Sequence, residues 1–266
     1  MDIKKVLYVT QELDPYLPAT PMGEYGHNVA LALQSAGAEV RTFMPKYGII
    51  NERRHQLHEV IRLSGLNIII DDTDHPLIIK VATLQPTRLQ VYFIDNDDYF
   101  FRSNDATLET VSDHENNGER SMFFIRGVYE TVKKLRWEPS LVQCTGWLTA
   151  LMPLYLRKLY ADDPAFNRST IAFTLYNDAF EGTLDERLAE KLIEQGFEPE
   201  QVEAFKALDW LALNKIAIDN ADVLVAGAKD IPAELIDYAT ASGKPFLRFD
   251  PEKDNAQACA EFFKSL

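Results

Sequence analysis

The first fifty residues constrain the fold more than any other part of the chain. An apolar run at Val6–Val9 is followed by a proline-bearing loop, an amphipathic segment at Glu24–Ala36 and a second apolar run at Glu39–Met44. This order predicts a strand, a helix and a parallel strand joined by a right-handed crossover. In such a sheet the loop after the first strand faces the ligand crevice, because strand carboxyl ends and helix amino ends meet there. We therefore predict that residues 11–24 border the ligand site.

The rest of the chain continues the alternation of strands and helices. Short strand-like runs separated by turn formers indicate an antiparallel excursion between residues 51 and 94. The later apolar spacing predicts helices at Asn117–Leu135, Trp147–Leu159, Leu184–Gln195, Pro199–Asn220, Ile231–Ala241 and Asp254–Leu266. It predicts strands at Leu141–Cys144, Ser169–Thr174, Val223–Ala226 and Pro245–Phe249. We expect an α/β fold, Rossmann-like and doubly wound, with a mostly parallel sheet and helices on both faces.

Charge and cysteine content exclude several classes of protein. The 41 acidic and 27 basic residues give a formal net charge of −14, which argues against a nucleic-acid partner and against binding to an anionic membrane. The only cysteines, Cys144 and Cys259, fit neither a zinc spacing nor a disulfide framework. No apolar run is long enough to span a bilayer. We expect a cytoplasmic protein with no metal and no cofactor, and the oligomeric state is left open.

Several segments carry a family resemblance when they are read in order. Residues 12–16 read E-L-D-P-Y, residues 44–50 read M-P-K-Y-G-I-I, and residues 173–177 read F-T-L-Y-N. They resemble the E-V-A-P-F, L-P-x-Y-G and F-T-I-H-N segments of bacterial glycogen and starch synthases, and the opening matches without a gap. Further matching segments lie at residues 91–100, 119–124, 147–153 and 160–164. Landmarks in this order over residues 3 to about 228 make chance similarity an inadequate explanation.

The resemblance implies a domain organisation. Synthases of this family have two Rossmann-like halves with the active site between them, and the second half binds most of the nucleotide sugar. The chain resembles a single half of this two-domain glycosyltransferase fold. We expect a synthase-like domain at residues 1–228 and an α-β-α extension at residues 229–266 that packs on the same domain. Phe262, Phe263 and Leu266 share one helical face, which we expect to cover an otherwise exposed edge.

The chemical residues of the family's site are replaced in this chain. The lysine of the family's K-T-G-G-L loop falls on Pro18, and the histidine of F-T-I-H-N falls on Tyr176. The H-A-H-D-W-H segment falls on residues 143–148, which read Q-C-T-G-W-L and keep only the tryptophan. The family's substrate-binding positions, carried over from the resemblance, are Pro18, Met22, Gly23, Glu24, Gln143, Thr145, Trp147, Tyr176 and Asn177.

These replacements decide the functional prediction. Glucose transfer from a nucleotide sugar requires neutralisation of the leaving diphosphate, commonly by lysine or arginine. We predict no catalytic residue and no transferase activity from this chain alone, and a binding or regulatory role for α-glucan or for a separate glycosyltransferase. One alternative is an active enzyme that transfers glucose from a nucleotide sugar to α-glucan once a partner chain completes it. The other is a scaffold or oligomerisation domain.

Other candidate sites give weaker signals. The acidic runs at Asp71–His75 and Asp95–Asp98 lack a calcium-loop spacing, and we interpret them as solvated turns. Residues 112–115 combine serine, aspartate, histidine and glutamate, yet catalytic triads are assembled across a fold and not from neighbours. We interpret Cys144 as an inert core thiol and His27 as a helix-surface residue. Aromatic residues at loop and strand ends could stack on a sugar ring, although core packing accounts for most of them.

Overall fold

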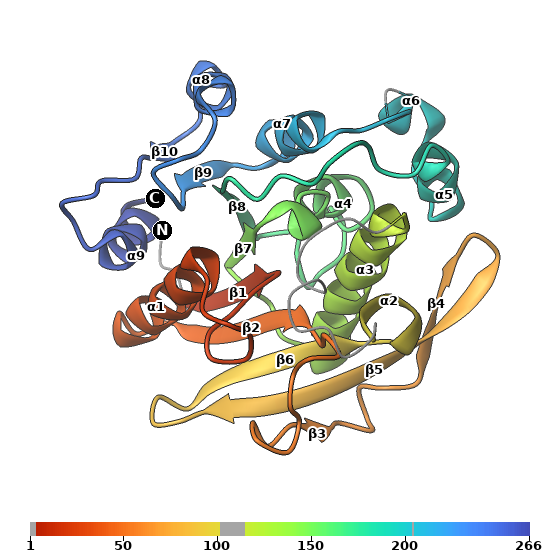
Figure 1. Ribbon diagram of the computed structural model, residues 1–266, viewed down its shortest axis with the longest axis horizontal. Helices are drawn as coiled ribbons and strands as arrows, with labels where there is room; N and C mark the ends of the chain where they lie inside the picture. Colours follow the sequence, from red (N-terminus) through yellow and green to blue (C-terminus); the bar gives the residue numbers. More distant parts are fainter. Residues whose placement is uncertain (1–3, 102–114, 204) are drawn as a thin grey trace.

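The computed structural model describes residues 4–101, 115–203 and 205–266 (Figure 1). The strands are β1 (Lys5–Thr10), β2 (Glu39–Pro45), β3 (His58–Glu59), β4 (Leu66–Ile70), β5 (Thr73–Leu84), β6 (Leu89–Asp95), β7 (Leu141–Thr145), β8 (Thr170–Leu175), β9 (Val223–Ala226) and β10 (Phe246–Leu247). The helices are α1 (Pro21–Ser35), α2 (Asp97–Phe100), α3 (Asn117–Leu135), η1 (Trp147–Thr149), α4 (Met152–Lys158), α5 (Leu188–Glu194), α6 (Pro199–Val202), α7 (Trp210–Asn220), α8 (Ala233–Ala241) and α9 (Asn255–Ser265).

The strands form a mostly parallel sheet in the order β10-β9-β8-β7-β1-β2-β6-β5-β3, and β4 pairs with β5. Strand β1 lies in the middle and pairs in parallel with both β2 and β7. The chain runs outward from β1 first to one side and then to the other, which confirms the predicted doubly wound α/β fold. Strand β5 pairs antiparallel with β6, β3 and β4, so the antiparallel excursion is also confirmed.

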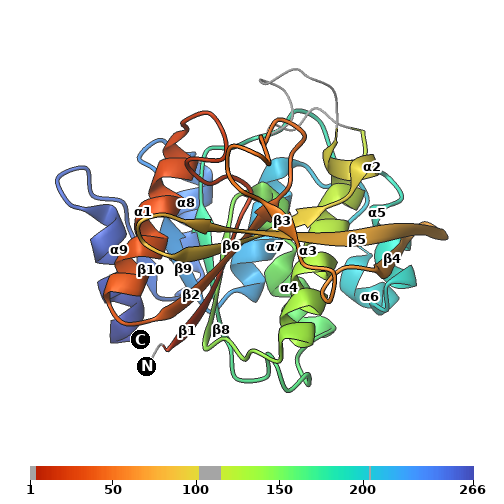
Figure 2. The same cartoon turned by 90° about the horizontal axis from the view of Figure 1, so that it is seen from below.

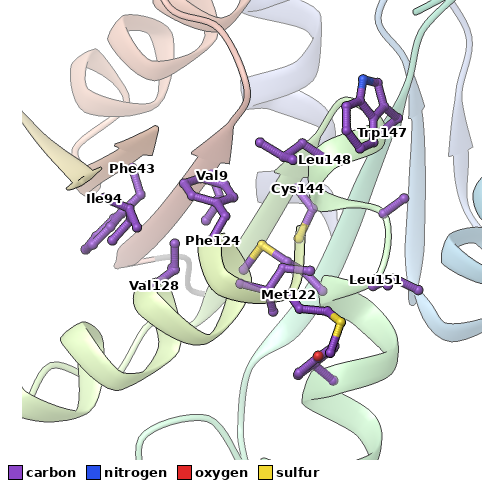
Figure 3. Close-up of a cluster of buried hydrophobic side chains, with 14 of the residues drawn as sticks. Val9, Phe43, Ile94, Met122, Phe124, Val128, Cys144, Trp147, Leu148 and Leu151 are labelled. Atoms are coloured by element: carbon purple, nitrogen blue, oxygen red, sulfur yellow. The ribbon is translucent and has the colours of Figure 1, made fainter. Parts of the chain in front are cut away.

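Helices cover both faces of the sheet (Figures 1 and 2). Side chains alternate along β1, so Val6 and Tyr8 face α1 and α9 while Leu7 and Val9 face the opposite layer. On that second face, helix α3 packs Phe124 and other apolar residues against strand residues such as Val9 (Figure 3). Helices α4 and α7 complete the same layer. None of the helices in the described ranges is long and apolar enough to cross a membrane.

Two predicted helices are interrupted in the structure. The segment Pro199–Asn220, predicted as one helix, forms α6 and α7, because the Asp209 carboxylate accepts the Ala212 N–H at 2.7 Å and starts a new helix. The segment Trp147–Leu159 divides into η1 and α4. Its first turn closes through 3₁₀ bonds, with the Thr149 N–H donating to the Gly146 carbonyl at 3.1 Å. Both boundaries depend on local hydrogen bonds that apolar spacing does not encode.

Two other helix starts also differ from prediction. Helix α1 starts at Pro21, earlier than the predicted Glu24, because the Thr20 hydroxyl caps it and proline is favoured in the first turn. Helix α5 starts at Leu188 and not at Leu184.

Helix α9 packs on a face of the sheet beside α1. Cys259, Ala260 and Phe263 are buried there, and Phe262 and Leu266 are half-buried on the same cluster. The predicted packing of these apolar residues is therefore correct, but the predicted location at a sheet edge is wrong. Strand β10 occupies that edge through its parallel pairing with β9, and α9 crosses back over the face.

Candidate functional site

The loops that follow β1, β7, β8 and β9 converge on one cavity of about 300 Å³, which we call the crevice. All of these loops leave the carboxyl ends of parallel strands, where α/β sheets place ligand sites. The crevice is lined by Gln11, Glu12, Thr20, Pro21, Met22, Trp147, Tyr176, Asn177, Asp178, Ala179, Ala228 and Asp230. The location agrees with the prediction that residues 11–24 border the site.

The Thr20 hydroxyl joins the first loop to helix α1. It donates a 2.5 Å hydrogen bond to Glu12 Oε2 and accepts the Gly23 N–H at 3.0 Å. A Cβ atom on Gly23 would lie 3.1 Å from Thr20 Oγ1 and 3.3 Å from the Asp14 nitrogen. Gly23 therefore allows the loop to pack tightly on the first turn of the helix.

Asp178 connects the loops after β7 and β8. Its carboxylate accepts the Trp147 N–H at 2.8 Å and the Trp210 indole N–H at 2.9 Å. Burial raises the pKa of Asp178, although these hydrogen bonds oppose the shift. Asp178 therefore holds Trp147 in place and also presents a carboxylate to the crevice.

Gly146 and Gln11 fill the place of the family's aspartate. Gly146 has a φ of +85°, and a Cβ atom there would lie only 2.5 Å from the carboxamide of Gln11. The same carboxamide oxygen accepts the Leu148 N–H at 3.2 Å. An aspartate at position 146 would need both a left-handed backbone and space that Gln11 occupies.

Tyr176, at the family's histidine position, is a packing residue. Its ring lies so close to Gly227 that a Cβ atom there would be 2.4 Å away, and it meets Tyr25 edge-on with ring centroids 6.2 Å apart. The Tyr176 hydroxyl is buried and has no hydrogen-bond partner among the described residues. Burial raises the pKa of Tyr176 well above its usual value, so the phenol stays protonated.

The structure brings together only part of the predicted substrate site. Met22, Trp147, Tyr176 and Asn177 line the crevice, and Asn177 donates to Asp230 at 3.3 Å near its mouth. Pro18 is exposed and does not belong to the lining.

The remaining predicted positions lie beside or below the crevice. Glu24 is exposed in a neighbouring cavity, and Gly23 is buried in the helix start. Gln143 and Thr145 are buried within β7. Gln143 donates to the Thr174 hydroxyl, and the Thr145 hydroxyl lies 3.5 Å from that of Tyr8. These two strand positions therefore hold the sheet together and do not reach the ligand space.

Sequence reasoning missed Asp178, Ala179, Ala228 and Asp230 as lining residues. Each lies directly after a strand or in the loop that follows one, which is the signal that could have identified them. Among the described lining residues, Glu12, Asp178 and Asp230 are acidic and none is lysine or arginine. The crevice therefore disfavours an anionic ligand.

The weaker candidates have structural roles. Burial raises the pKa of the Cys144 thiol, which agrees with an inert core residue. His27 lies 3.3 Å from the Asp14 carboxylate beside the first loop. The interpretation of Asp71–His75 as a solvated turn is correct for Asp71 and Asp72, although Asp71 also pairs with Arg187 at 2.8 Å. It is wrong for His75, which lies in β5 and is buried against Tyr99.

The second acidic run, Asp95–Asp98, is also more than a solvated turn. Asp95 pairs with Lys80 at 2.8 Å, and the Asn96 side chain caps α2. Residues 112–114 lie outside the described residues, so the run at 112–115 stays untested. No group of histidine, cysteine and carboxylate side chains in the described ranges could hold a metal ion.

Replacing Glu12 with glutamine is expected to stabilise the protein at pH 7. Burial, assisted by the negative charge of Asp178, raises the pKa of Glu12 above its usual 4.5, although the Thr20 hydrogen bond opposes the shift. A raised pKa means that the folded state binds the proton more tightly, so stability falls as the pH rises from the usual pKa to the raised one. The glutamine variant lacks this penalty, and its advantage should shrink as the pH is lowered toward 4.

Urea unfolding midpoints of the wild type and the Glu12→Gln variant at pH 7 and pH 4 check this prediction. Glu24→Gln, at an exposed position in the first turn of α1, is the control and should show little change. A Glu12→Gln variant less stable than the wild type at pH 7 would contradict the expectation.

A family model and the most similar curated proteins point to one family. The family described as "Starch synthase catalytic domain" matches residues 5–242. The glycogen synthase of Chlorobium limicola is 32% identical over 235 residues, which are 87% of this chain and 47% of that enzyme. The glycogen synthase of Chlorobaculum parvum is 31% identical over an alignment 268 positions long, which covers 98% of this chain and 52% of that enzyme. The chain therefore spans about half the length of the curated relatives it matches.

A solved structure shows the same fold. The catalytic domain of starch synthase IV from Arabidopsis thaliana, bound to ADP and acarbose, is similar with a TM-score of 0.73. The sequence identity is 18%, and the match covers 93% of this chain and 51% of that chain. The mostly parallel sheet and its helical layers are thus those of a glycosyltransferase catalytic domain.

Proposed function

Because this chain belongs to the starch synthase catalytic domain family, we propose that it is a synthase-like domain that binds α-glucan in the crevice without transferring glucose itself. The observation that carries the proposal is the charge of the crevice. Its described lining has three carboxylates, Glu12, Asp178 and Asp230, and no cation. We include in the proposal a division into a domain at residues 1–228 and an extension at residues 229–266, since the extension buries Phe263 on the same sheet.

The start of helix α1 also argues against a nucleotide-sugar donor. A helix amino terminus binds phosphate through free N–H groups and its positive dipole end. In α1, Pro21 has no N–H group and the Gly23 N–H is already donated to the Thr20 hydroxyl. A diphosphate would therefore meet carboxylates and few donors, and the energetic cost of that encounter supports a neutral ligand.

The lining suits the hydroxyl groups of a sugar. Carboxylate and carboxamide oxygens of Asp178, Asp230 and Asn177 can accept hydrogen bonds from sugar hydroxyls. Met22, Pro21 and Trp147 supply the apolar surface that a sugar ring can contact. The Arabidopsis relative binds ADP and acarbose, and of these the present crevice is suited to a ligand without phosphate.

Calorimetry with maltotriose, ADP-glucose and UDP-glucose tests the proposal. We expect maltotriose to bind and both nucleotide sugars to give no heat above dilution. Asn177→Ala, which removes an exposed amide at the mouth, should weaken maltotriose binding about tenfold, the effect of one hydrogen bond of roughly 1–1.5 kcal/mol.

Two further measurements complete the test. Asn167→Ala is the matched control, since Asn167 is exposed just before the amino end of β8, whereas the crevice lies at the carboxyl ends of the strands. Transfer of labelled glucose from either nucleotide sugar to glycogen should stay at the background level. Tight nucleotide-sugar binding or unaided transfer would reject the proposal.

An alternative is glucose transfer that a second chain completes. Membership of the family favours it, because the curated relatives that this chain matches are glycogen synthases. Under this alternative, glucose incorporation into glycogen should appear only when a separate glycosyltransferase chain is added to this one.

A further inference from the structure

A second cavity of about 450 Å³ adjoins the crevice. The two cavities share Pro21, Ala228 and Asp230 in their linings, so they meet across the start of α1 and the loop after β9. We call this cavity the second compartment. Phe249 and residues 253–256, near the carboxyl end, form part of its lining.

The second compartment has two walls from distant parts of the sequence. Helix α1 provides Tyr25 and Asn28, and the segment leading into α9 provides Phe249. Figure 2 shows this segment beside the amino-terminal end of α1. The segment is held by Asn255, which accepts the Asp250 N–H at 2.9 Å and donates to the Asp250 carbonyl at 2.7 Å. These two hydrogen bonds hold the segment in one conformation in the absence of a ligand.

The charges of the compartment nearly cancel. Its lining contains Lys229 and Lys253 together with Glu24, Asp230 and Asp254, and Lys253 pairs with Asp250 at 3.0 Å. No cluster of unpaired cations is available for a phosphate group among these described residues. The compartment is thus suited to a neutral ligand.

The lining of the second compartment includes two aromatic side chains and the amide group of Asn28. Tyr25 and Phe249 are half-buried and line the compartment, and the hydroxyl of Tyr25 is buried. Asn28 is exposed, and no hydrogen bond or ion pair joins its side chain to another described residue. Rings that pack against C–H groups and amides that bond hydroxyls are the two elements of sugar recognition.

We propose that the crevice and the second compartment form one groove that binds successive glucose units of an α-glucan. This inference rests on the proposed function, which places a glucan in the crevice. It adds that the protein prefers long glucans to short ones. The glucose units that extend beyond the crevice would contact residues of the carboxyl-terminal segment. Phe249 and Asn28 are then specificity-determining residues for long glucans.

Titration of the intact chain with maltose, maltotriose, maltopentaose and maltoheptaose tests the inference. The affinity is expected to rise at least tenfold from maltose to maltoheptaose. In Phe249→Ala and in Asn28→Ala, maltoheptaose should bind five- to tenfold more weakly while maltose binding stays unchanged. Asn28→Ala changes an exposed side chain and keeps the test valid if the Phe249 variant is less stable.

Phe101→Ala is the matched control, because Phe101 is exposed at the end of α2 and this helix lies on the other side of the molecule from α9 (Figure 2). Maltose binding with no dependence on chain length would overturn this inference and leave the proposed function standing. Equal weakening of maltose and maltoheptaose binding in both groove variants would also overturn the inference alone. If no maltooligosaccharide binds, the proposed function and this inference fail together.

Discussion

Removing residues 251–266 is expected to leave a protein that aggregates or fails to fold. The deleted segment contains α9, which buries Cys259, Ala260 and Phe263 on the sheet face formed by Val6, Tyr8 and their neighbours. Burial of one large apolar side chain contributes about 1.5–3 kcal/mol, and the deletion would also expose the strand residues beneath. The total loss is a large part of the free energy of unfolding of a typical domain, which is roughly 5–15 kcal/mol.

Circular dichroism melting and size-exclusion chromatography measure this effect. A milder version of the experiment compares Phe263→Ala with Glu261→Ala, because Phe263 is buried and Glu261 is exposed on the same helix. We expect a loss of about 3–5 kcal/mol for the first and little change for the second. A soluble truncated protein with an unchanged melting temperature would contradict the role given to α9.

Gly146→Asp is expected to destabilise the protein by roughly 3 kcal/mol or more. The backbone at Gly146 is left-handed, with a φ of +85°, and the new Cβ atom would lie 2.5 Å from the Gln11 carboxamide. Strain at such a backbone position costs about 1–3 kcal/mol, and overpacking costs about as much again. Introducing the family's aspartate at this position should therefore damage the fold.

A double-mutant cycle separates the two causes. Gln11→Ala combined with Gly146→Asp should be less destabilised than the sum of the single variants by about 1 kcal/mol or more, because the overlap is relieved while the backbone strain remains. Gly37→Asp is the control for strain alone, since Gly37 has a φ of +96° and nothing within 4 Å of its Cβ position. Purely additive effects at positions 11 and 146 would show that the close contact carries no energetic weight.

The order of strands and helices could be predicted from the sequence because it depends on local periodicity. Apolar spacing locates α3 at Asn117–Leu135 without error. The break between α6 and α7 could not be predicted in this way, since it depends on the capping carboxylate of Asp209. Propensity and periodicity describe the middle of an element better than its ends.

The position of the candidate site could be predicted from the sequence, but only some of its lining residues could. The residues after β1 were expected at the crevice because strand ends meet there, and Met22, Trp147, Tyr176 and Asn177 do line it. The role of Asp178 depends on two hydrogen bonds to residues 31 and 32 positions away along the chain. Contacts of this kind are set by tertiary packing, which a single sequence does not display.

The contact between Tyr176 and Gly227 limits the substitutions that the protein can accept at these two positions. The phenol ring covers the glycine so closely that any Cβ atom at position 227 would collide with it. A smaller side chain at position 176 would leave a void above that glycine, and a larger one at 227 would be rejected while the ring is present. The two positions therefore constrain each other, as Gln11 and Gly146 do, and a change at only one position of either pair is expected to lower the stability of the fold.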